Sequence, residues 1–189
     1  MHSLTVPHEP ASAPGGAFAA GAGASLRNFY VDRGEIGDVG LAAFCSHIIH
    51  APASVLQNLY ELWLSNNQIG DEGAVALFDA LGDGALANLG DLRLQFNQVG
   101  DAGLDRLSVA LGKGALSKTW YLGLSDNAFT DVGLGVLEVC VEAGGMPRLE
   151  FLTASSAKAT LAAQKRLQDA ASGAMAARAK RGPGPRGRS

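Results

Sequence analysis

The fold is decided by residues 59–81, LYELWLSNNQIGDEGAVALFDAL, because this stretch recurs along the chain at a fixed interval. Thirty residues further on comes 89–111, LGDLRLQFNQVGDAGLDRLSVAL, and thirty beyond that comes 119–141, TWYLGLSDNAFTDVGLGVLEVCV. A period of this length is typical of repeat proteins, in which each repeat is one small unit and stacked units share a continuous core. The sequence therefore predicts a repeat architecture.

The first half of each unit predicts a short strand followed by a tight turn. Leu62 and Leu64 are two residues apart, which places both on one face of a strand because side chains alternate along it. Asn67 follows, and its side-chain amide both donates and accepts hydrogen bonds, so it satisfies backbone groups in a buried turn. We therefore expect buried leucines on the strand and a buried asparagine in the turn.

The second half of each unit predicts a short helix. Asp71 suits the N-cap, where a carboxylate accepts from the free amides of the first turn. Gly73 has no Cβ, which lets the helix lie close to its neighbour. Leu77 and Leu81 are four residues apart and form a buried stripe. Stacked units then place parallel strands along one surface and helices along the other.

The pattern LxxLxLxxNxIGDxG followed by a leucine-striped helix resembles the leucine-rich repeat of the ribonuclease-inhibitor type. This resemblance implies an α/β fold, a right-handed solenoid in a short horseshoe arc, with parallel strands on the concave face and helices on the convex face. Similar repeats occur in immune-receptor sensor domains and in activators of the Ran GTPase. Since most proteins built on such repeats are interaction scaffolds, the resemblance implies a binding protein.

Composition and repeat spacing divide the chain into four predicted segments. These are a disordered Ala/Gly/Pro-rich arm at 1–24, the repeat domain at 25–157, a C-terminal capping helix at 158–181 and a disordered basic tail at 182–189. The repeat domain holds about four full repeats and a fifth strand. In the first unit Gly34 stands where Asn67 stands in the second, so we expect the asparagine turns to begin one repeat later.

Charge is unevenly distributed along the chain. From Lys158 onward there are eight Lys or Arg residues and one acidic residue, a net charge of +7, whereas the preceding 157 residues carry −10. A basic tail binds nucleic acid, serves as a nuclear import signal, or only keeps an acidic body in solution. Any nucleic-acid binding is therefore predicted through this tail alone, and the three alternatives remain open.

The sequence also bears on location. It contains no apolar run near the roughly 18 residues of a membrane span, and no basic stretch followed by the apolar core of a secretory signal. Cys45 and Cys140 lie three repeats apart, too far to form a disulfide, and free thiols suit a reducing compartment. We predict a monomeric cytoplasmic protein, with a nuclear location as the alternative.

Candidate catalytic and metal-binding residues are sparse. No histidine follows His50, so any Ser-His-Asp or Cys-His set requires His47 or His50, both on the helical side of an end repeat. These two histidines are three residues apart on a predicted helix but lack further ligands at zinc-site spacing. We therefore predict a protein that is not an enzyme and uses no cofactor or metal.

The outward positions of the strands carry the best functional signal. Adjacent strands lie about 4.8 Å apart, so outward residues at equal repeat positions are neighbours. Aromatic residues and arginine are the usual anchors of protein interfaces. We predict that a partner protein binds Tyr30, Glu61, Trp63, Asp91, Arg93, Phe96, Tyr121 and Phe151. The alternative is that these rings only cover the backbone of neighbouring strands.

Three functional hypotheses follow. The first is a protein-interaction module that uses its concave face. The second, by resemblance to Ran activators, is a GTPase-activating regulator, for which Arg33 and Arg93 are the concave-side arginines. The third is a nuclear or nucleic-acid factor that acts through the basic tail. The chain is also short for such an array, so a fragment of a larger immune-receptor-like repeat protein is a further alternative.

Overall fold

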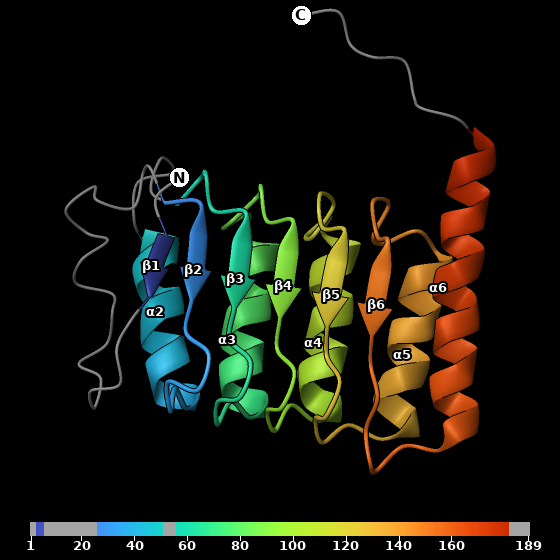
Figure 1. Ribbon diagram of the computed structural model, residues 1–189, viewed down its shortest axis with the longest axis horizontal. Coiled ribbons are helices and arrows are strands. Elements are labelled where there is room, and N and C mark those ends of the chain that lie inside the picture. The colour runs from blue at the N-terminus through green and yellow to red at the C-terminus, as the bar shows by residue number, and fades with distance from the viewer. Residues whose placement is uncertain (1–2, 6–25, 51–55, 182–189) are drawn as a thin grey trace, which may run out of the picture.

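The computed structural model describes residues 3–5, 26–50 and 56–181. In this part of the chain, six short parallel strands form one sheet in the order β1-β2-β3-β4-β5-β6, and five helices alternate with them. Figure 1 shows the strands as one layer and the helices as a second layer behind it, with the units stacked in chain order. The repeats therefore build the predicted α/β solenoid, with one strand face and one helical face.

The strands of successive units pair residue by residue. Leu62 of β3 lies opposite Leu92 of β4, which lies opposite Leu122 of β5. Each strand is three residues long, and in the five strands of the repeat units the middle residue points into the core. The five strands of the repeat units are β2 (Asn28–Tyr30), β3 (Glu61–Trp63), β4 (Asp91–Arg93), β5 (Tyr121–Gly123) and β6 (Phe151–Thr153).

The helices cover one face of the sheet and close its C-terminal end. They are α2 (Asp38–His50), α3 (Asp71–Gly82), α4 (Asp101–Gly112), α5 (Asp131–Glu142) and α6 (Leu161–Arg181). The last helix packs on α5 and buries Ala163, Leu167 and Ala171, which are spaced four residues apart. It begins at Leu161 and not at Lys158 as predicted, because the Thr160 hydroxyl accepts from the Ala163 amide at 3.2 Å and caps the helix there.

The asparagine turns are buried as predicted. Asn97 donates from Nδ2 to the carbonyls of Leu64 and Leu94, at 2.9 and 3.1 Å. Its Oδ1 accepts from the Ile69 amide at 3.1 Å. Asn67 accepts in the same way from the Gly34 amide of the first unit, at 3.0 Å. The first unit thus depends on the second to complete its turn, which confirms where the ladder begins.

The helix-starting aspartates correct the predicted capping. Asp71 lies inside its own helix, whose N-cap is Gly70, and it makes no cap there. Its Oδ1 instead accepts from the amides of Gly100 and Gly103, at 2.7 and 2.9 Å, where the next helix begins. Each carboxylate therefore caps the helix of the following repeat. A Cβ on Gly103 would lie 3.0 Å from that oxygen, so glycine leaves the space for it.

The predicted disordered arm is wrong at three residues. Ser3–Thr5 form strand β1, which pairs in parallel with β2, placing Leu4 opposite Phe29. The exposed edge of β2 has unpaired backbone groups that attract another strand, and the sequence pattern gave no sign of this addition. The rest of the predicted arm and the basic tail at 182–189 lie outside the described residues.

Candidate protein-binding surface

Four side chains on the strand face form a continuous stack. The ring centroids of Tyr30 and Trp63 are 4.2 Å apart with an interplanar angle of 33°. The Arg93 guanidinium lies 3.9 Å from the Trp63 ring centroid and 4.7 Å from that of Tyr121. These residues come from β2, β3, β4 and β5, whose register brings them together. We call Tyr30, Trp63, Arg93 and Tyr121 the aromatic–arginine stack.

Asp91 holds the arginine of the stack in one orientation. Arg93 donates from Nε to Asp91 Oδ1 at 3.0 Å and from Nη2 to Oδ2 at 2.8 Å. The hydrogen bond to Asp91 raises the pKa of Arg93, so the guanidinium is always charged. Asp91 is only 1% exposed, which makes it a poor contact for a partner, contrary to the prediction. Its role is to fix Arg93 and cancel its charge.

Tyr30 and Glu61 form a second fixed pair. The Tyr30 hydroxyl donates to Glu61 Oε2 and accepts from Asn28 Nδ2. Burial, followed by the hydrogen bond to Glu61, raises the pKa of Tyr30 to about 12. The phenol therefore remains protonated near neutral pH, and the half-buried Glu61 contributes negative charge at this end of the stack.

Polar side chains support the other end of the stack. Gln95 donates from Nε2 to the Tyr121 hydroxyl at 3.1 Å, and its Oε1 accepts from the Ser65 hydroxyl at 3.0 Å. A Cβ on Gly123 would lie 2.2 Å from Gln95 Nε2, so the absence of a side chain there makes room for Gln95. Sequence reasoning missed Gln95, although a glycine among larger outward residues was the available signal.

Phe96 and Phe151 are the exposed aromatic residues of this surface, each 55% exposed. The Phe151 ring lies 6.3 Å from Tyr121 and 6.0 Å from Trp120, so it extends the stack toward β6. Phe96 lies in the turn after β4. Sequence reasoning missed Trp120 because it precedes the strand, outside the alternating outward positions. Of the predicted set, all but Asp91 are at least partly exposed on this face.

A leucine-rich-repeat family model matches residues 55–78 and 85–108, which cover the second and third units. The chain is a leucine-rich-repeat protein. Among solved structures, it is similar to leiomodin-1 actin-binding site 2, with a TM-score of 0.64 and 13% sequence identity. That likeness covers 89% of this chain and 91% of the other, and it supports the fold alone. No curated protein matches the sequence.

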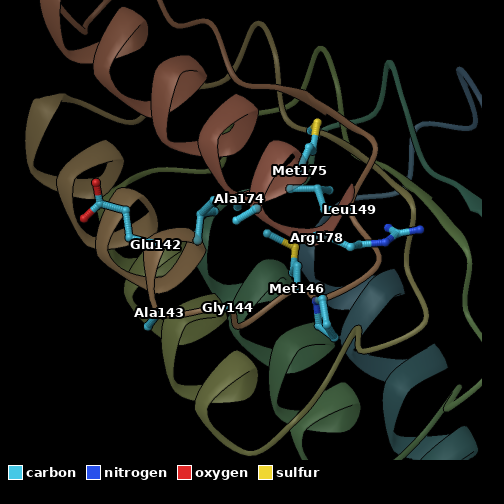
Figure 2. A pocket seen from close by; sticks show the side chains of 11 residues that line it. Glu142, Ala143, Gly144, Met146, Leu149, Ala174, Met175 and Arg178 are labelled. Carbon is cyan, nitrogen blue, oxygen red and sulfur yellow. The ribbon is translucent and has the colours of Figure 1, made fainter. Parts of the chain in front are cut away.

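This leucine-rich-repeat protein has a hollow of about 400 Å³ at its C-terminal end, between the loop after α5 and the last turns of α6. Figure 2 shows Met146, Leu149 and Met175 around it, with Arg178 at one side and Glu142 at the other. The lining contains no histidine, cysteine or hydroxyl residue. The hollow is therefore lined mainly by apolar side chains, with Glu142 as the one carboxylate among its lining residues.

The side chains and helices of this leucine-rich-repeat protein also bear on metal binding and membrane insertion. Among the described residues, no three histidine, cysteine, aspartate or glutamate side chains are grouped to hold a metal ion. Within the same residues, no helix is long and apolar enough to cross a membrane. Cys45 and Cys140 are both free thiols, and burial raises the pKa of Cys45 to about 12. That thiol is consequently unreactive, because the thiolate is the reactive form.

Proposed function

We propose that this leucine-rich-repeat protein is an interaction module that binds a partner protein through its strand face. The observation that carries the proposal is the aromatic–arginine stack, in which two tyrosines, a tryptophan and an arginine are held in place before any partner binds. Tryptophan, tyrosine and arginine dominate the energetics of protein interfaces. Because these side chains are already ordered, binding costs less conformational entropy than it would on a flexible surface.

The exposed Phe151 ring beside the stack strengthens the proposal. Phe151 is more than half exposed, and its ring continues the ring contacts of Tyr121. Contiguous exposed aromatic groups on a soluble protein usually mark a binding site. The leiomodin-1 structure concerns actin binding by its name, but at 13% identity the likeness is one of fold. The partner's chemistry is therefore argued from the surface of this chain.

A GTPase-activating role for Arg93 is disfavoured by its geometry. A catalytic arginine of that kind must reach the transferred phosphate with its guanidinium. Arg93 instead directs Nε and Nη2 to Asp91 and lies between two rings, with its side chain 31% exposed. Arg33 is exposed in the first unit, and within the described residues no hydrogen bond or ion pair fixes its guanidinium. The binding role accounts for the stack without a catalytic step.

The basic C-terminal segment gives weaker support to a nucleic-acid role. Arg166 pairs with Glu138 at 3.3 Å, and Arg178 pairs with Glu150 at 3.5 Å. These ion pairs use part of the positive charge of α6 to attach the helix to the repeat body. We therefore propose that α6 serves mainly as an end cap and that the protein acts in the cytoplasm, where its free thiols stay reduced.

The test is affinity capture from a cell lysate with the wild-type chain, Trp63→Ala and the helical-face control Val139→Ala. Val139 is 65% exposed on α5, so its truncation leaves the strand face unchanged. We expect a partner that is retained by wild type and the control and lost by Trp63→Ala. With that partner purified, Trp63→Ala should weaken the Kd at least about tenfold, or about 1.4 kcal/mol. Loss with Val139→Ala and retention with Trp63→Ala would place the interface on the helices.

A further inference from the structure

Phe96 adopts a backbone conformation that is unfavourable for a bulky side chain. Its φ angle is +56°, in the left-handed region. The same turn position in the flanking repeats is occupied by Asn66, with φ +56°, and Asp126, with φ +59°. Asparagine and aspartate tolerate this region because their short polar side chains bond locally, whereas a bulky side chain there is strained. Asn or Asp therefore fits this position best, and both the first unit, with Arg33, and the third unit, with Phe96, depart from it.

Burial does not compensate this strain. Three leucines with positive φ follow the helices, namely Leu56, Leu86 and Leu116, and all are buried in the core. Apolar burial offsets the conformational cost at those positions. Phe96 is 55% exposed, so the fold gains little from its ring. The remaining non-glycine residues with positive φ, Arg33 and Glu35, are exposed charged residues of the atypical first unit. Phe96 thus combines a strained backbone with an exposed apolar side chain.

An exposed carboxylate lies in the turn next to that of Phe96. The Phe96 amide donates to the Ser125 carbonyl at 3.0 Å, which sets its turn beside the turn that contains the exposed Asp126. On the preceding strand, the charge of Arg93 is cancelled by Asp91. A cation is attracted both to the face of an aromatic ring and to a carboxylate. The charge and the ring therefore favour the same kind of partner group.

We propose that Phe96 is a partner-contact residue retained at a cost to fold stability, and that the partner is a basic peptide segment. A Lys or Arg of that segment lies between the Phe96 ring and the Asp126 carboxylate. This inference rests on the proposed function of the strand face and adds the chemistry of the partner and its contact point.

The stability part is tested by thermal unfolding of the full chain carrying Phe96→Asn or Phe96→Ala. Asparagine relieves the left-handed strain, so Phe96→Asn should raise the Tm by about 2–4 °C. Alanine removes the ring but tolerates this conformation poorly, so Phe96→Ala should give no such rise and serves as the matched control. A Tm for Phe96→Asn equal to or below the wild-type value overturns the claim that the fold bears a cost at Phe96.

The binding part uses a phage-displayed library of random 12-residue peptides selected on the immobilised full chain. We expect the enriched peptides to carry net positive charge and to bind Phe96→Asn, Phe96→Ala and Asp126→Asn at least about tenfold more weakly than wild type. Their affinity for wild type should fall as salt is raised, because exposed charges are screened. Val139→Ala should bind them as wild type does.

The outcomes separate this inference from the proposed function. Peptides that lose affinity for Trp63→Ala but keep it for both Phe96 variants would overturn the inference and leave the strand face as the binding surface. Peptides that keep affinity for all of these variants bind elsewhere and would count against both. Enrichment of acidic or neutral peptides, or of none, would overturn the basic-partner chemistry.

Discussion

Along strands β3, β4 and β5, the residues that point into the core are identical between repeats, whereas those on the strand face differ. The inward residues in register are Leu62, Leu92 and Leu122, all fully buried. The outward residues in register are Trp63, Arg93 and Gly123. Equal core positions must fill equal spaces, because interiors are close-packed. The outward positions are free of that constraint, so their departure from repetition points to a use other than folding.

The largest expected effect separates the core of one repeat from the strand face of the next. Leu94→Ala, in the core of the central unit, should lower the free energy of unfolding by about 2–5 kcal/mol because it leaves a cavity. Ser125→Ala, on the strand face, should cost under about 1 kcal/mol, since its hydroxyl accepts only a long bond of 3.3 Å from the Ser155 amide. Urea unfolding measures both. Equal losses of unfolding free energy in the two variants would show that the assignment of Leu94 to the core and Ser125 to the surface is wrong.

The next largest effect concerns the asparagine ladder. Asn97→Ala removes the side chain that pairs the Leu64 carbonyl and the Ile69 amide in neighbouring turns. Each buried backbone group left unpaired costs about 1–3 kcal/mol, so the variant should lose more stability than its loss of apolar surface predicts. The same urea experiment gives the value. An unchanged midpoint would mean that water replaces the amide and that the turn is not a structural element.

The features predicted from sequence are those that the repeat imposes at every unit. Leu62 and Asn67 recur at fixed spacing with a single physical role, so one unit was enough to infer the others. The direction of the aspartate caps was not predictable in this way. Asp71 is close both to the start of its own helix and to that of the next, and only the stacking distance between units decides which amides it reaches.

The candidate site was predicted less completely, because outward position does not ensure exposure. Asp91 is at an outward position, yet the Arg93 side chain bonds to it and Asp91 is buried. Trp120 lies before its strand, where the inward–outward alternation of strand side chains does not apply. Its ring nevertheless contacts those of Tyr121 and Phe151. These contacts depend on the chosen orientations of long side chains, which residue spacing does not specify.

A smaller effect tests the corrected capping between repeats. Asp71→Ala removes the acceptor for the Gly100 and Gly103 amides and should cost about 1 kcal/mol, as for other helix caps. Hydrogen exchange should show the loss at the start of α4 and not at the start of α3. Faster exchange confined to the first turn of α3 would restore the prediction that Asp71 caps its own helix.

The smallest expected effect is a titration on the strand face. Because the folded pKa of Tyr30 is raised to about 12, the folded chain retains a proton there that the unfolded chain loses near pH 10. Its contribution to stability is therefore fully present below about pH 10 and is lost as the pH rises toward 12.

Tyr30→Phe should lack this pH dependence, and ultraviolet titration of the phenols should lose its highest-pH component. Glu61→Gln removes the negative charge beside the phenol, so in that variant the component should move to lower pH. A Tyr30 that ionises with the other tyrosines would show that the Tyr30–Glu61 pair does not persist in solution, leaving the outer end of the stack unsupported.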